Sequence, residues 1–264
     1  MTLTLGNGPL AAGAPLTVNY RVDGPAHKIL FSDFPRRVRA TFAGRTVLDT
    51  TQGRLLHESN ILPMLYVPTK DVDQDLLVAT DQSTHCPFKG DASYWSIVVN
   101  DRTADNAVWG YPDPNDDAGW LKDHQAFYWA KLDAWFDEDE QVEGHLRDPY
   151  HRVDARSSSR HVRVQAGGTV VAESTRPVVV SETGLPNRFY LPTADVETTL
   201  LTSSTTRTHC PYKGWASYWS FRDGAADVAW SYEDPFSDAA KAAGHLCFAG
   251  DDITTEVDGE VVDG

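Results

Sequence analysis

The sequence predicts a mainly β protein of two homologous antiparallel domains, each a β-sandwich or rolled barrel with few short helices. Three observations predict this fold class: the chain repeats itself, its apolar residues alternate with polar ones over short runs, and stretches suited to helices are few. At 264 residues with 41% hydrophobic residues, the chain can form two ordinary domains, each with its own core.

The internal repeat is clearest in two nearly identical strings. Over Thr84–Ser96 and Thr208–Ser220, eleven of thirteen residues are identical, whereas chance would give about one. The offset is 124 residues here and upstream, and it falls to 121 afterwards because the first copy has a longer turn. Residues aligned in this way include His27 with His151, Glu58 with Glu182, Tyr66 with Tyr190, Trp109 with Trp230 and His124 with His245.

This alignment predicts four parts of the chain. Residues 1–26, rich in Gly, Ala and Pro, are expected to be an arm with little structure of its own. Residues 27–143 form the first β domain, 144–150 a linker and 151–264 the second β domain.

Short alternating runs within each repeat predict half-buried antiparallel strands. The runs 37–42 and 161–166 end at Ala-Gly and Ala-Gly-Gly, which predicts a hairpin into the strand that follows each of them. Aromatic-rich runs predict further strands at 93–99 and 107–111, and 125–136 continues in the same style.

Helical signals are few. The alanine-rich stretch 234–245 has Ser237 or Asp238 as its predicted N-cap and Gly244 at its end. Residues 115–124 predict a shorter counterpart in the first repeat. One helical turn is expected after each Tyr-x-Pro-Thr-x-Asp-Val string.

Charge and composition restrict the possible partners. A net charge of -15 disfavours nucleic acid and anionic membrane surfaces. Because the start lacks a basic segment followed by an apolar run, and no run could span a bilayer, we expect a cytoplasmic protein. The expected partner is a small-molecule ligand or substrate, with no nucleic acid and no membrane, and the oligomeric state stays open.

The three cysteines, Cys86, Cys210 and Cys247, are expected to be free thiols, because the count is odd and no Cys-x-x-Cys pair occurs. The sequence has no dinucleotide-binding, P-loop, zinc-protease or serine-hydrolase motif. We therefore expect no cofactor. The three histidines of each repeat lack a known local ligand spacing, so no metal is expected either.

The string His-Cys-Pro-[Phe/Tyr]-Lys-Gly predicts a turn, because Pro211 cannot sit in a central ladder and Gly214 permits unusual dihedrals. Such a turn can place Cys210 beside Lys213, whose ammonium would lower the thiol pKa. Adjacency does not make His209 a catalytic base, since neighbours along an extended chain point apart. A purely structural cysteine and lysine are the alternative.

The repeated aromatic residues suggest a wall for a small flat organic ligand, and an aromatic-filled β core is the alternative. Tyr218 and Trp219 should face opposite sides of their strand, whereas Trp230 and Tyr232 should share a face. The two glutamates could pair with the two lysines, as a general acid or base or as plain ion pairs. Candidate catalytic residues are Cys86, Cys210, Lys89, Lys213, Glu58 and Glu182, and candidate ligand-binding residues are Thr84, Thr208, Tyr94, Tyr218, Trp109, Trp230, Tyr111 and Tyr232.

Together, Thr-His-Cys-Pro-[Phe/Tyr]-Lys-Gly-x-Ala-Ser-Tyr-Trp-Ser, the later Trp-x-Tyr-x-Asp-Pro and the upstream Tyr-x-Pro string resemble a bacterial and fungal family catalogued as domain of unknown function 427. The resemblance covers nearly the whole chain, once per repeat. It implies a compact β fold related to the β-tent, in which two antiparallel sheets meet at an angle, and it implies no settled activity.

Three functions follow from these residues. The first is binding of a small organic ligand in an aromatic-lined pocket with Cys, Lys and Glu, with enzymatic activity left open. The second is a structural or interaction protein in which the motif only stabilises the fold. The third is cysteine-dependent acyl transfer or hydrolysis of a small metabolite, which needs a base within hydrogen-bond reach of the thiol.

Overall fold

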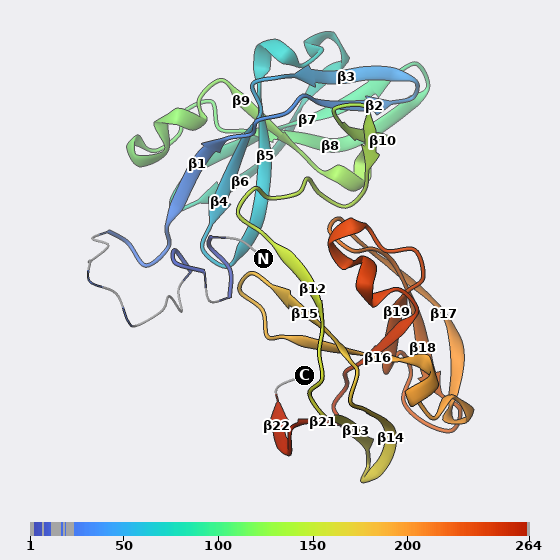
Figure 1. Ribbon diagram of the computed structural model, residues 1–264. Coiled ribbons are helices and arrows are strands. Elements are labelled where there is room, and N and C mark those ends of the chain that lie inside the picture. Colours follow the sequence, from blue (N-terminus) through green and yellow to red (C-terminus); the bar gives the residue numbers. More distant parts are fainter. Residues whose placement is uncertain (1–2, 7, 12–16, 18, 20–23, 263–264) are drawn as a thin grey trace. The chain divides into compact units, whose positions relative to one another are not determined.

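The computed structural model describes residues 3–6, 8–11, 17, 19 and 24–262. It divides into two compact units, the first ending at Asp148 and the second beginning at Pro149 (Figure 1). Much of the predicted arm, residues 1–26, lies outside the described residues. Of its described part, the Leu10 carbonyl accepts a hydrogen bond from Ser59 Oγ at 3.0 Å, and Leu3 and Leu10 are joined through their backbones.

The first unit is built almost entirely of strands, joined by short 3₁₀ helices. Its strands are β1 (Ile29–Asp33), β2 (Val38–Phe42), β3 (Arg45–Thr50), β4 (Arg54–Glu58), β5 (Ile61–Pro68), β6 (Leu77–Cys86), β7 (Gly90–Val99), β8 (Arg102–Gly110), β9 (His124–Phe127), β10 (Ala134–Asp137) and β11 (Glu140–Val142). Its 3₁₀ helices are η1 (Thr69–Asp71), η2 (Gln74–Leu76), η3 (Asp116–Leu121) and η4 (Trp129–Lys131).

The second unit repeats this order of strands. They are β12 (Val153–Ser157), β13 (Val162–Ala166), β14 (Thr169–Ser174), β15 (Val178–Glu182), β16 (Arg188–Pro192), β17 (Leu201–Cys210), β18 (Gly214–Phe221), β19 (Ala229–Tyr232), β20 (His245–Phe248), β21 (Ile253–Val257) and β22 (Glu260–Val262). Its 3₁₀ helices are η5 (Thr193–Asp195), η6 (Thr198–Leu200) and η7 (Ser237–Ala242).

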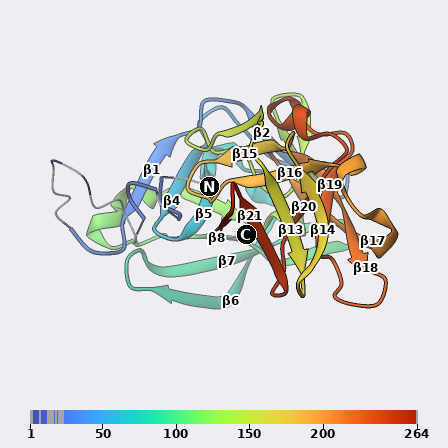
Figure 2. The same ribbon diagram turned by 60° about the horizontal axis from the view of Figure 1, so that its bottom comes forward.

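Each unit contains a seven-stranded and a four-stranded antiparallel sheet, in the same strand order. The first unit has β1-β4-β5-β9-β8-β7-β6 and β11-β10-β2-β3. The second has β12-β15-β16-β20-β19-β18-β17 and β14-β13-β21-β22, of which β13, β14 and β21 are seen side by side in Figure 2. The prediction of a mainly β protein with two homologous antiparallel halves is therefore confirmed, and neither seven-stranded sheet closes into a barrel.

Alternation along the strands gives each seven-stranded sheet two apolar faces. On β4 and β5, Leu55 and Leu65 join the core shared with the four-stranded sheet, whereas Leu56 and Tyr66 join a second core on the opposite face. The second unit has the same two cores, with Leu191 in one and Tyr190 in the other. Because the four-stranded sheet covers only one face, the second core depends on the curvature of the large sheet.

That curvature is strong. In a flat sheet, β4 and β7 would lie about 19 Å apart, because neighbouring strands are separated by about 4.8 Å. Yet Lys89, in the turn before β7, reaches Glu58 at the end of β4 with 2.6 Å between Nζ and Oε2. The sheet thus curls around its second core, and Ala118 and Leu121 of η3 pack against that core.

The predicted hairpins are confirmed, and two of the helical predictions are wrong. Strands β2 and β3 pair around Ala43 and Gly44, and β13 and β14 pair around two glycines. The alanine-rich stretch forms only the 3₁₀ helix η7, capped by Phe236 without a side-chain hydrogen bond, so neither Ser237 nor Asp238 is its N-cap. Its counterpart η3 is also six residues long and therefore not shorter.

Two further segments were predicted from the sequence: the single helical turns and the run 125–136. The single helical turns expected after the Tyr-x-Pro strings are η2 and η6. The run 125–136 is not continuous, because η4 separates β9 from β10. Within the described part of the chain, no helix is long and apolar enough to cross a membrane.

Candidate functional site

The repeated Cys-Pro-[Phe/Tyr]-Lys-Gly string forms a tight turn at the same place in both units. Cys86 ends β6, Gly90 begins β7, and the Lys89 N–H donates to the Cys86 carbonyl at 3.2 Å. Gly90 has φ +100°, and a Cβ there would lie 3.3 Å from the Asn115 nitrogen. The positive φ and the close approach of the Asn115 backbone therefore both favour glycine at position 90. Gly214 has the same geometry in the second unit, with φ +101°.

This turn aims Lys89 at a buried carboxylate. The exposed fractions of the Lys89 and Glu58 side chains are only 11% and 9%. The other oxygen of Glu58 lies 3.3 Å from His27 Nε2, and the His27 ring stacks on Phe88 with 4.2 Å between centroids. The ion pair predicted as one reading of these residues is therefore present, and His27 completes it as a third polar group.

The second unit reproduces the group. Lys213 Nζ hydrogen-bonds Glu182, whose Oε2 lies 3.5 Å from His151 Nε2. Burial alone would raise the pKa of Glu182, but the hydrogen bond from His151 and the charge and hydrogen bond of Lys213 outweigh it and lower that pKa to about 2. Glu182 is thus an ionised partner in a buried pair at neutral pH.

In each unit a tyrosine, Tyr111 or Tyr232, lies next to the buried ion pair. Lys89 Nζ is 5.6 Å from the Tyr111 ring centroid. Burial raises the pKa of Tyr111, and the neighbouring Cys86 and Glu58 raise it further. Tyr232 in the second unit shows the same shift, caused first by burial and then by Cys210 and Glu182. The structure therefore brings the predicted glutamate, lysine, cysteine and tyrosine of each repeat into one neighbourhood.

The remaining predicted residues complete the wall of the second core. Thr84 Oγ1 and the Tyr94 hydroxyl lie 2.9 Å apart, and Thr208 and Tyr218 repeat this contact at 3.0 Å. Tyr218 and Trp219 face opposite cores, as predicted. Trp230 and Tyr232 share a face, also as predicted, and so do Trp109 and Tyr111.

The cysteines have no hydrogen-bonded base in the described part of the chain. Cys86 and Cys210 are half-buried, and no histidine or carboxylate hydrogen-bonds either thiol among the described residues. Cys247 is buried on β20, and burial raises its thiol pKa to about 12. His85 contacts Asp91 at 2.7 Å and lies outside the Glu58 group. Among the described residues, no three His, Cys, Asp or Glu side chains converge as metal ligands do.

Sequence reasoning missed a continuous row of rings on the first unit, here called the aromatic row: Trp120, Phe31, Tyr66, Trp109 and Tyr128. Neighbouring ring centroids along the row are 4.8, 6.0, 6.4 and 4.6 Å apart. Tyr66 is buried at its centre, and its hydroxyl accepts from Trp109 Nε1 at 3.4 Å. Trp120 and Tyr128 at the ends remain 36% and 42% exposed.

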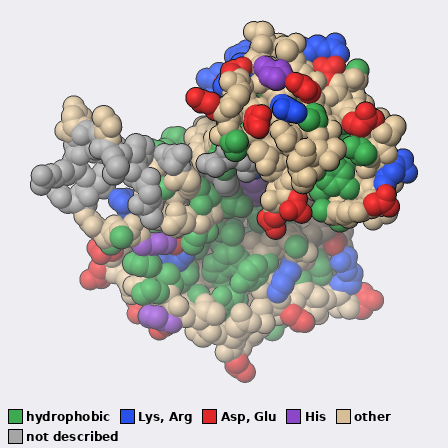
Figure 3. Space-filling model, turned by 90° about the horizontal axis from the view of Figure 1, so that it is seen from below, with side chains coloured by type: hydrophobic (Ala, Val, Ile, Leu, Met, Phe, Trp, Pro, Cys, Tyr) green, Lys and Arg blue, Asp and Glu red, His purple; other side chains and the backbone are tan. Residues whose placement is uncertain are grey.

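The row belongs to the curled face of the large sheet. Figure 3 shows hydrophobic side chains gathered on one face of the first unit. The row also adjoins the buried ion pair, since Glu58 and Cys86 are among the groups that raise the pKa of Tyr66, after its burial. An exposed aromatic surface next to a few fixed polar groups is typical of a ligand site.

The second unit retains only the middle of the row. Tyr190 and Trp230 stand where Tyr66 and Trp109 stand in the first, with a hydrogen bond of 2.9 Å from Trp230 Nε1. The other three rings are replaced, and Arg188 in place of Met64 lies 5.7 Å from the Trp230 ring. The replacements are Ala155 for Phe31, Lys241 for Trp120 and Ala249 for Tyr128. A signal for the row was therefore present as a difference between the two copies.

Comparison with known proteins gives a family and no activity. A family model described as Domain of unknown function (DUF427) matches the chain twice, over residues 31–138 and 154–263. The two matches correspond to the two repeats and cover most of the chain. Among curated proteins, no sequence matches this chain.

Proposed function

The chain belongs to the family described as a domain of unknown function (DUF427), and from this premise we propose that it binds a small organic molecule on the aromatic row of its first repeat. The single observation that carries the proposal is the continuity of the row from Trp120 to Tyr128, with exposed rings at both ends. The exposed rings at the two ends can stack with an aromatic or cyclic ligand, and the buried rings between them hold their positions.

The buried Glu58–Lys89 pair supplies the polar part of this site. A buried ion pair contributes little net stability, because the cost of removing two charges from water offsets their attraction. Its presence beside Tyr111 and the row, with His27 as a further donor or acceptor, supports a role in orienting a polar group of the ligand. In this proposal Cys86 and Tyr111 line the polar part of the site, next to Tyr66 at the centre of the row.

No observation favours cysteine chemistry, since neither Cys86 nor Cys210 has a hydrogen-bonded base among the described side chains. A purely structural motif is supported by the burial of Tyr94 and Tyr111. The binding experiment separates that reading from the proposed one, because a structural motif predicts no ligand.

A thermal-shift screen of aromatic fragments tests the proposal. We expect fragments that raise the unfolding temperature of the wild-type chain and lose this effect in Trp120→Lys and Tyr128→Ala, which introduce the residues of the second repeat. Trp215→Ala removes an exposed tryptophan of the second unit and is the matched control. Fragments that stabilise all of these variants equally, or no stabilising fragment at all, would contradict the proposal.

A further inference from the structure

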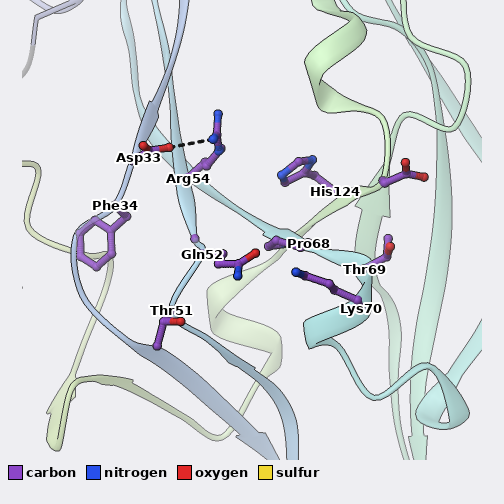
Figure 4. A pocket seen from close by; sticks show the side chains of 11 residues that line it. Asp33, Phe34, Thr51, Gln52, Arg54, Pro68, Thr69, Lys70 and His124 are labelled. Carbon is purple, nitrogen blue, oxygen red and sulfur yellow. Dashed lines mark ion pairs between the residues drawn. The ribbon is translucent and has the colours of Figure 1, made fainter.

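The first unit also contains a pocket of about 640 Å³ whose lining includes none of the residues discussed so far as ligand-binding or catalytic. It lies where the end of β1 and the start of β4 meet the β5–η1 junction and the start of β9 (Figure 4). Its volume is in the range of small-molecule sites. It is lined by Asp33, Phe34, Thr51, Gln52, Gly53, Arg54, Pro68, Thr69, Lys70, Asp123 and His124.

The charged side chains of this pocket are balanced but incompletely paired. Arg54 and Asp33 form an ion pair of 2.9 Å, drawn as the dashed line in Figure 4. Lys70 and Asp123, both exposed, also line the pocket with opposite charges, and among the described residues neither has an ion-pair partner. The side chains of Gln52 and Lys70 point into the same space in Figure 4. Two opposite charges without ion-pair partners in one pocket lining suit a ligand that carries both signs itself.

The second repeat gives an internal comparison for this pocket. It keeps Pro192, Thr193 and His245, and His245 Nδ1 lies 2.9 Å from the Ala243 carbonyl as His124 Nδ1 lies 3.0 Å from that of Lys122. All four charged residues of the pocket are replaced. The replacements are Ser157 for Asp33, Val178 for Arg54, Ala194 for Lys70 and Gly244 for Asp123. The fold is therefore formed without these charges, and the first repeat alone carries them.

Asp123 shows most clearly that the charges are not needed by the fold. Its φ is +62°, a left-handed conformation that glycine adopts freely and that aspartate adopts more readily than most other L-residues. Gly244, its counterpart, has φ +65°. A glycine in the second repeat forms the same turn, so the fold at this position does not require the carboxylate.

From the unpaired opposite charges and their confinement to one repeat, we propose that this pocket binds a small zwitterion of the amino-acid class. The ligand carboxylate lies at Lys70, its ammonium at Asp123, and its side chain against Phe34 and Pro68. Gln52 and the His124 ring offer further hydrogen bonds. The pocket and the aromatic row meet at Phe31, since Arg54 and His124 lie 5.4 and 5.2 Å from its ring, but their ligand groups differ and the two proposals are independent.

Nuclear magnetic resonance titration tests the pocket directly. The ¹⁵N-labelled chain is titrated with glycine, L-leucine, L-phenylalanine and L-arginine, and then with 3-phenylpropionate and phenethylamine, which keep only one charge of phenylalanine. We expect at least one amino acid to shift the amide signals of Thr69, Lys70 and His124, and a single-charge analogue to bind about tenfold more weakly than phenylalanine if phenylalanine binds.

Variants that copy the second repeat separate binding from folding. Lys70→Ala and Asp123→Gly should each weaken binding by about tenfold or more without lowering the unfolding temperature. Lys241→Ala, which removes an exposed ammonium of the second unit, should leave binding unchanged. If no amino acid shifts these signals at millimolar concentration, or if Lys70→Ala and Asp123→Gly bind like the wild type, the inference is overturned.

Discussion

Lys89 Nζ lies 2.6 Å from Glu58 Oε2, although three strands separate β4 from β7 in the sheet that carries them. The contact joins distant parts of one curled sheet, and Lys213 and Glu182 make the same contact in the second unit. The pair closes the curled sheet, and in the proposed function it is also the polar part of the ligand site; the two roles predict different results.

The first prediction concerns the closure. Lys89→Met or Glu58→Leu alone should lower the free energy of unfolding by about 3–5 kcal/mol, because each leaves one buried charge without its partner. The double variant should lose much less, since two apolar side chains can pack where the pair was. Denaturant unfolding followed by tryptophan fluorescence measures this. A loss in the double variant equal to the sum of the two single losses would show that the pair is not coupled.

The second prediction concerns acid stability. The folded-state pKa of Glu182 is about 2, against an ordinary value of 4.5, so the unfolded chain takes up a proton first as the pH falls. The stabilisation by Glu182 should be complete above about pH 4.5 and be lost progressively towards pH 2. Unfolding free energies of wild type and Glu182→Gln across this range measure it. A wild-type profile that Glu182→Gln leaves unchanged would contradict the assigned pKa.

These interactions show what the sequence could predict. The offset between the repeats aligned Glu58 with Glu182 and Lys89 with Lys213, and the apolar strand before each glutamate indicated burial. The ion pairs could therefore be predicted from the sequence. The hairpin at Ala43–Gly44 was predictable for the same reason, because its signal is local.

Other features depend on distant residues and carry no local signal. Phe31 and Trp120 come from β1 and η3, and Tyr128 directly follows β9. Only the curl of the sheet aligns their rings with Tyr66. The pocket around Lys70 and Asp123 likewise joins four separate segments. The predicted N-cap at Ser237 or Asp238 is wrong because the 3₁₀ helix already begins at Ser237, so that its N-cap is Phe236, whose side chain has no hydrogen-bonding group.

The third prediction concerns the thiols. Cys247 should resist alkylation in the native state, because its side chain is buried and its pKa is raised to about 12, so thiolate is scarce at neutral pH. Cys86 and Cys210, which are half-buried, should react faster with iodoacetamide. Mass spectrometry of the labelled peptides measures this, with the unfolded chain as the control in which all three react. Native labelling of Cys247 at the rate of Cys86 would exclude the buried position on β20.

The fourth prediction concerns the turn that positions the lysine. Gly90→Ala should destabilise the first unit by about 1–3 kcal/mol, because φ is +100° and the added Cβ would lie 3.3 Å from the Asn115 backbone nitrogen. Gly119→Ala, where no atom lies within 4 Å of the added Cβ, is the control and should be close to neutral. Thermal unfolding of both variants measures the difference, and equal stability would show that the turn does not require glycine.

The most direct test of the proposed function observes the rings themselves. In a chain labelled with ¹⁵N-tryptophan, an aromatic fragment that binds the row should shift the indole N–H signals of Trp109 and Trp120. Trp135 is only 3% exposed and packs in the opposite core, so its signal should not shift. Tyr128→Ala should abolish the shifts. If no fragment moves Trp109 and Trp120, or if Trp135 moves with them, the aromatic row is not a ligand site.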